Sequence, residues 1–145
     1  MAITVKRITL WRGEVPNRAG ALGEVLGPLS AAGANLQVAM GYRIPGQADR
    51  AIIEVAPVAG RKASAAAAGA GLTASSIPTL IAVGDDKPGL GYAMSKAIAG
   101  AGINMGFMVA QVIGRKFTAI IGFENEADAV KAAPLIKKAK PGKKG

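Results

Sequence analysis

The chain has 145 residues, of which 50% are hydrophobic and only 4% aromatic, and its formal net charge at pH 7 is +9. Because it contains no cysteine and no histidine, disulfide bonds, thiolate metal sites and imidazole catalysis are excluded. We therefore expect a globular protein with a core of small side chains and without a metal or cofactor.

The two ends of the chain carry most of the information about location and charge. The N-terminal segment contains Lys6, Arg7 and Arg12 and no continuous apolar run, and the most apolar stretch, residues 98–114, is shorter than the roughly 20 residues that cross a bilayer. We expect a cytoplasmic protein with no membrane partner. Five lysines lie in the last nine residues, and without them the net charge is 9 − 5 = +4. Residues 139–145 are interpreted as a disordered basic tail that binds nucleic acid only weakly.

The first half of the chain alternates between strand-like and helix-like patterns. A run of strand-forming residues at 8–15 is followed by apolar residues at helical spacing between 22 and 29, and Gly33 ends this helix. An alanine-rich segment predicts a second helix, after a hairpin with a Pro-Gly turn. The expected order is strand, helix, two strands, helix and strand, over residues 8–15, 22–29, 36–44, 51–55, 61–72 and 75–83.

The second half repeats this order but ends before its last strand. We predict a strand at 80–83, a helix at 90–101, strands at 104–113 and 117–123, and a helix at 126–138. The residues after Lys138 are rich in lysine, proline and glycine and do not predict a strand. The second sheet would then be one strand short, or would take a strand from the N-terminal segment that begins at Ala2.

Two segments of the chain align without gaps at an offset of 86 − 17 = 69 residues. They are NRAGALGEVLGPLSAAGANLQV from Asn17 and DKPGLGYAMSKAIAGAGINMGF from Asp86. A period of this length is typical of tandem domains. We predict an α+β fold of two tandem ferredoxin-like βαββαβ units, each an antiparallel sheet with helices on one face, with a first domain at residues 1–74 and a second at 75–138. The aligned pairs include Gly20 with Gly89, Gly33 with Gly102, and Asn35 with Asn104.

This doubled motif resembles that of the ACT domain family, in which a D-[RK]-P-G-x-L turn precedes a helix and G-[IV]-N begins the next strand. The second repeat has DKPGLG and AGIN, and the first has NRAGAL and AGAN. Ala19 stands where proline is usual, Asn17 where aspartate is usual, and Gly91 where leucine is usual. The resemblance implies a stand-alone tandem ACT protein, which would be an amino-acid-binding regulatory module without an attached enzyme domain.

The loop at residues 85–90 is the predicted ligand site. It precedes a helix, so free N–H groups and the helix dipole favour a carboxylate, while Asp86 and Asn104 supply acceptors for an ammonium group. In the first repeat Asn17 replaces the aspartate, so the two sites should not be equivalent. The alternative interpretation is structural, with Asp86 as a helix cap and Gly89 as a turn residue. The candidate binding residues are Asp86, Lys87, Pro88, Gly89, Leu90 and Asn104 in the second repeat, and Asn17, Arg18, Gly20, Ala21 and Asn35 in the first.

The predicted function is the binding of a small molecule, an amino acid, at the glycine turn between ACT units. Unpaired sheet edges favour a homodimer, and occupancy would be passed to the dimer or to a regulated partner protein. The alternatives are a nucleic-acid-associated protein that uses the sheet and the basic tail, or a purely structural dimerisation protein. Catalysis is not expected, because Asp85 and Asp86 are the only adjacent carboxylates and no pair of nucleophile and base is visible.

Overall fold

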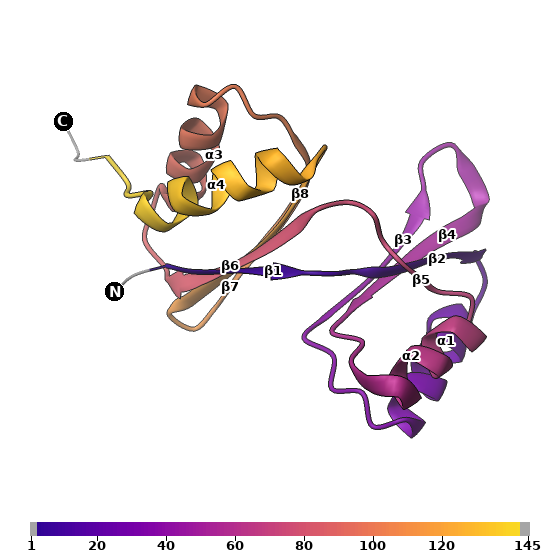
Figure 1. The fold of residues 1–145 in the computed structure, drawn as a ribbon. Coiled ribbons are helices and arrows are strands. Elements are labelled where there is room, and N and C mark those ends of the chain that lie inside the picture. Colours follow the sequence, from indigo (N-terminus) through magenta and orange to yellow (C-terminus); the bar gives the residue numbers. More distant parts are fainter. Residues whose placement is uncertain (1–2, 143–145) are drawn as a thin grey trace. The chain divides into compact units, whose positions relative to one another are not determined.

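The computed structural model of the protein describes residues 3–142. The chain forms two compact units, which are drawn in Figure 1. We call residues 9–76 the repeat-1 unit, and residues 1–8 together with 77–145 the repeat-2 unit. Each contains a four-stranded antiparallel sheet and two helices, which confirms the predicted α+β, ferredoxin-like fold class. Within residues 3–142, no helix has the length and apolar character needed to span a membrane.

The repeat-1 unit is built from one continuous segment. Its elements are β2 (Trp11–Pro16), α1 (Ala21–Ala31), β3 (Val38–Ile44), β4 (Gln47–Ala56), α2 (Gly60–Gly69) and β5 (Thr73–Ala74). The strand order is β3-β4-β2-β5, and both helices cover one face of this sheet (Figure 1). Val25 and Leu29, one helical turn apart on α1, pack with Ile53 and Val55, which share a face of β4. This core holds the helices on the sheet.

The repeat-2 unit has the same architecture. Its elements are β1 (Thr4–Ile8), β6 (Thr79–Asp85), α3 (Leu90–Gly100), β7 (Met105–Ile113), β8 (Lys116–Phe123) and α4 (Glu126–Lys138). The strand order is β1-β6-β8-β7, with both helices on one face (Figure 1). Met94 and Ile98 of α3, Ile136 of α4, and Ile121 and Phe123 of β8 are fully buried in its core. Apolar residues four apart on α3 therefore face the sheet, as the periodicity predicts.

The fourth strand of the repeat-2 unit comes from the other end of the chain. Strand β1 runs antiparallel to β6, from the pair Thr4↔Val83 to the pair Ile8↔Thr79, in the edge position that β5 holds beside β2. The contiguous ranges 1–74 and 75–138 are therefore wrong for residues 3–8, which belong with the second repeat. An N-terminal strand was one of the two solutions that the sequence left open.

The physical reason lies in the two candidate segments for this strand. TVKRI contains β-branched residues, and Ile3 and Val5 pack into the core of the unit, whereas the segment after α4 has proline, glycine and like-charged lysines that oppose strand pairing. Arg7 Nη2 also lies 2.7 Å from Glu126 Oε2 on α4. Of the predicted tail 139–145, residues 139–142 contain no helix or strand, and residues 143–145 lie outside the described residues.

A close backbone contact makes Gly13 a test of packing in the repeat-1 unit. A Cβ atom at position 13 would lie 2.6 Å from Leu72 Cδ2 and 2.9 Å from the carbonyl oxygen of Gly71. We expect Gly13→Ala to lower the free energy of unfolding by about 1–3 kcal/mol, measured by urea denaturation, because the backbone must shift. The control is Gly23→Ala on α1, where nothing lies within 4 Å of the new atom and helix propensity favours alanine by roughly 1 kcal/mol. Equal losses in both variants would contradict this account.

Candidate ligand-binding pocket

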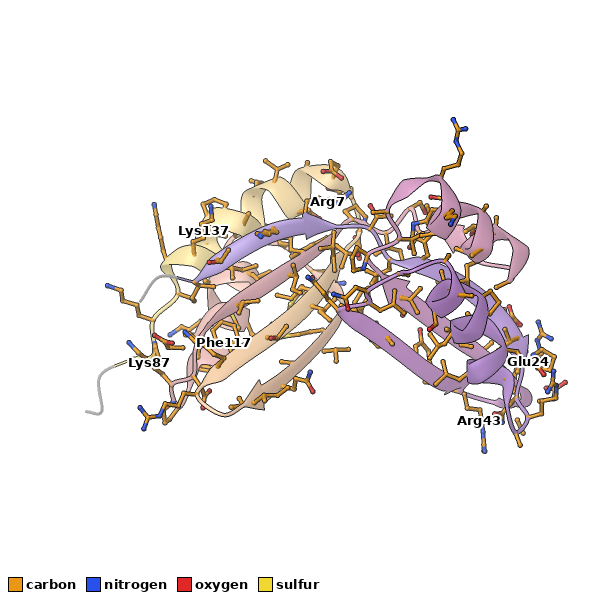
Figure 2. All side chains as sticks on the ribbon, turned by 90° about the horizontal axis from the view of Figure 1, so that it is seen from below. Arg7, Glu24, Arg43, Lys87, Phe117 and Lys137 are labelled. Atoms are coloured by element: carbon orange, nitrogen blue, oxygen red, sulfur yellow. The ribbon has the colours of Figure 1, made fainter. Side chains whose placement is uncertain are left out.

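A pocket of about 420 Å³ lies in the repeat-2 unit where β6 turns into α3. Five of the predicted site residues, 86–90, line it together with Gly91. Figure 2 labels Lys87 and Phe117 at the same end of the sheet. The remaining wall comes from one residue of α3, four residues of β7 and one residue of β8, which are Met94, Met108, Ala110, Gln111, Val112 and Phe117. The pocket thus has a polar turn on one side and a mainly apolar wall on the other.

The N-terminus of α3 is left without a side-chain cap. Its N-cap residue is Gly89, so the interpretation of Asp86 as the helix cap is wrong. The φ of 83° at Gly89 agrees with the other part of that interpretation, in which Gly89 is a turn residue. The amide of Leu90 donates to the carbonyl oxygen of Lys87, and that of Ala93 to Gly89. Within the described residues, the N–H groups of Gly91 and Tyr92 have no acceptor. In α4, by contrast, the side chain of Asn125 accepts from the amide of Asp128.

Two neighbouring carboxylates at this turn have different partners. Lys116 Nζ lies 2.5 Å from Asp85 Oδ1, and this hydrogen bond is the main cause that holds the pKa of Asp85 below its usual range. The side chain of Asp86 makes no ion pair or hydrogen bond with any described residue, although its amide donates to the carbonyl oxygen of Arg115. The backbone of Asp86 is therefore fixed while its carboxylate remains free beside the pocket.

The equivalent turn of the repeat-1 unit has its polar side chains already engaged. Asn17 Nδ2 donates to the carbonyl oxygen of Ala48 at 2.8 Å, and the guanidinium of Arg18 pairs with Glu24. The hydrogen bond between that pair raises the pKa of Arg18 and lowers the pKa of Glu24. Gly20 has φ of 87°, like Gly89 in the other unit, and Ala21 begins α1. Asn17 and Arg18 thus serve the local structure of the turn.

A second difference concerns the space above the sheet. At the offset of 69 residues, Leu22 matches Gly91 and Gly41 matches Ala110. Leu22 covers this part of β3, since a Cβ atom on Gly41 would lie 3.8 Å from Leu22 Cδ1. In the repeat-2 unit both Gly91 and Ala110 line the pocket, and nothing lies within 4 Å of a Cβ atom at position 91. The glycine at 91 thus leaves open the space that a leucine fills in the other repeat.

The predicted asparagines are not at these turns. Asn104 follows α3, whose 11 residues span about 16 Å, so it lies at the opposite helix end from Asp86. Asn104 Nδ2 donates to Glu124 Oε1 at 3.1 Å, and Asn104 does not line the pocket. Asn35 is exposed in the corresponding place after α1. Asp86 and Asn104 were expected to lie together, and within one unit they do not. The sequence analysis did not predict that Gly91, Met94 and the residues of β7 line the pocket. The signal in the sequence was the glycine at position 91, where leucine is usual.

Comparisons with known proteins show the fold but not the family. No protein family matches the sequence, and no curated protein matches it closely. Protein BT0572 from Bacteroides thetaiotaomicron superposes with a TM-score of 0.74 at 15% identity, covering 92% of this chain and 98% of that one. The ligand-free regulatory subunit of aspartate kinase from Thermus thermophilus gives a TM-score of 0.66 at 16% identity, with coverage of 96% and 97%. The corresponding subunit from Thermus flavus gives 0.58 at 17% identity, with coverage of 94% and 97%. The chain therefore has an ACT-like fold.

Proposed function

We propose that this protein is a stand-alone tandem ACT module that binds an amino acid in the pocket of the repeat-2 unit and regulates a partner protein. The observation that carries the proposal is the pocket itself, which joins an uncapped helix N-terminus, one free carboxylate and an apolar wall. Two of the similar structures are regulatory subunits of aspartate kinase, which supports a regulatory role. The proposed setting is a cytoplasmic homodimer that contacts its target.

The chemistry of the turn matches the two ends of an α-amino acid. The free N–H groups of Gly91 and Tyr92 and the ammonium of Lys87 favour the ligand carboxylate, and the carboxylate of Asp86 favours its ammonium group. The proposed orientation directs the ligand side chain toward Met94 and Phe117. Because this wall is apolar and the volume of about 420 Å³ is small, the ligand should be an amino acid with an aliphatic or thioether side chain.

A thermal-shift screen of the twenty amino acids tests this proposal, with isothermal titration calorimetry on each ligand that raises the melting temperature. We expect a selective shift with aliphatic L-amino acids and none with the corresponding amines, which lack the carboxylate. Asp86→Asn should weaken binding by about tenfold or more, since a hydrogen bond to a charged group contributes about 1.5–3 kcal/mol.

The matched control is Asp49→Asn, which removes one exposed carboxylate from β4 in the repeat-1 unit. It should leave the affinity within about twofold of the original, since surface charges at a distance are screened. No shift at millimolar concentrations, or the same loss in both variants, would refute the proposed ligand site.

A further inference from the structure

A second cavity in the repeat-2 unit has a strongly basic wall. It has a volume of about 660 Å³ and lies where β6 ends, α3 begins and α4 finishes. Figure 2 labels two of its lysines, Lys87 and Lys137, at this end of the unit. Its charged lining consists of Lys87, Lys137, Lys138, Lys140 and Asp85. Charged residues from the end of β6, from the turn before α3 and from the end of α4 with the segment after it therefore line one cavity.

The positive charge of this cavity is not neutralised within the described residues. Its one carboxylate, Asp85, is paired with Lys116, and none of the four lining lysines makes an ion pair in residues 3–142. Counting Asp85 and Lys116 as a neutral pair leaves a formal charge of +4 on the wall. Like charges gathered at one cavity repel one another, so the arrangement favours an anionic occupant.

Complementing a helix dipole explains only part of this cluster. Lys137 and Lys138 lie in the last turn of α4, where cations are favoured by the negative helix end. Lys140 lies just beyond the same helix end, but Lys87 belongs to the turn before α3. The position of Lys87 at the same cavity therefore requires another explanation.

We infer that this cavity binds a compact polyphosphate group, as in inorganic pyrophosphate, inorganic triphosphate or the phosphate end of a nucleotide. Four ammonium groups, from the turn before α3, from α4 and from the segment after α4, suit an anion with several charges close together. None of the described lining residues is aromatic, so nothing in the cavity stacks on a nucleobase. Recognition therefore rests on the phosphates, and inorganic triphosphate and ATP should bind with similar affinity.

Isothermal titration calorimetry of the full chain with inorganic triphosphate tests this site. We expect one ion bound per chain and an affinity that falls as salt is raised from 0.1 to 0.5 M, because screening weakens charge pairing. The double variant Lys87→Gln/Lys140→Gln should bind at least about tenfold more weakly, since it removes two charge-assisted contacts. Its melting temperature without ligand should be unchanged or higher, because like charges have been removed.

The matched control is Lys62→Gln/Lys131→Gln, which removes two exposed lysines that do not line the cavity. It should retain the affinity for triphosphate within about twofold. Lys87 lines both this cavity and the proposed amino-acid pocket, whereas Asp86 lines only the amino-acid pocket. Asp86→Asn should therefore also retain the affinity for triphosphate, which distinguishes the two sites. An equal loss in both double variants, or binding of single-stranded RNA or anionic phosphatidylserine vesicles without binding of triphosphate, would overturn the inference.

Discussion

Gly91→Leu should close the pocket of the repeat-2 unit and weaken amino-acid binding by at least about tenfold, because forcing side-chain atoms into occupied space costs typically 1–3 kcal/mol. The repeat-1 unit shows where such a side chain goes, since Leu22 covers β3 at Gly41. A leucine at position 91 would cover Ala110 in the same way. Calorimetry with the amino acid that gives the largest thermal shift measures the effect.

This variant should not unfold the chain. Leucine is a better helix former than glycine, so the melting temperature without ligand should be unchanged or slightly higher. The matched control is Gly100→Leu, an exposed position at the other end of α3 where nothing lies within 4 Å of a new Cβ atom. It should bind the ligand normally. Normal binding by Gly91→Leu would mean that the ligand lies elsewhere.

A chain that begins at Thr9 should fold only in its repeat-1 unit. Without β1, the repeat-2 unit loses a five-residue strand and the buried Ile3, and β6 becomes an open edge. Burial of one such side chain contributes about 1.5–3 kcal/mol and each hydrogen bond about 1 kcal/mol, so the loss approaches the stability of a small domain, about 5–15 kcal/mol. Hydrogen exchange should show lost protection in β6 and β8 and retained protection in β4.

Moving the strand provides the control for this deletion. Ile3 lines the same cavity as Ala139 and Pro141, so the start of β1 lies close to the end of α4. Residues 3–8 attached after Pro141 through a short flexible linker should therefore restore protection in β6. Full protection in the shortened chain without this addition would contradict the role given to β1.

The local patterns of the sequence predicted most elements of both units. Helices α1, α3 and α4 follow from apolar residues three and four apart, a signal that depends on near neighbours alone. The partner of β1 could not be read in this way, because Thr4 pairs with Val83 across 79 positions of chain. Residues 8–15 were predicted as one strand, whereas the structure has β1 ending at Ile8 and β2 beginning at Trp11. A strand pattern identifies a strand but not its sheet.

The same limit applies to the binding residues. The turn at residues 86–90 was found because its motif is continuous in sequence and forms one wall of the pocket. Asn104 was predicted at the same site as Asp86, but the whole of α3 lies between the two residues and separates them in space. The sequence shows that Gly91 replaces the usual leucine. The effect of this replacement on the pocket depends on Ala110 of β7, which lies near Gly91 only in the folded unit.

The pairing of β1 with β6 imposes an order on folding during synthesis. The strand leaves the ribosome before its partner β6, which is complete only at Asp85, 77 residues after Ile8, or roughly 4–15 s later at about 5–20 residues per second. The repeat-1 unit can fold completely in this interval, since its segment is continuous. During this interval β1 has no partner strand. The charges of Lys6 and Arg7 oppose its pairing with the same strand of a neighbouring nascent chain. We therefore expect the two cations of this edge strand to oppose pairing between nascent chains as well as between finished sheets.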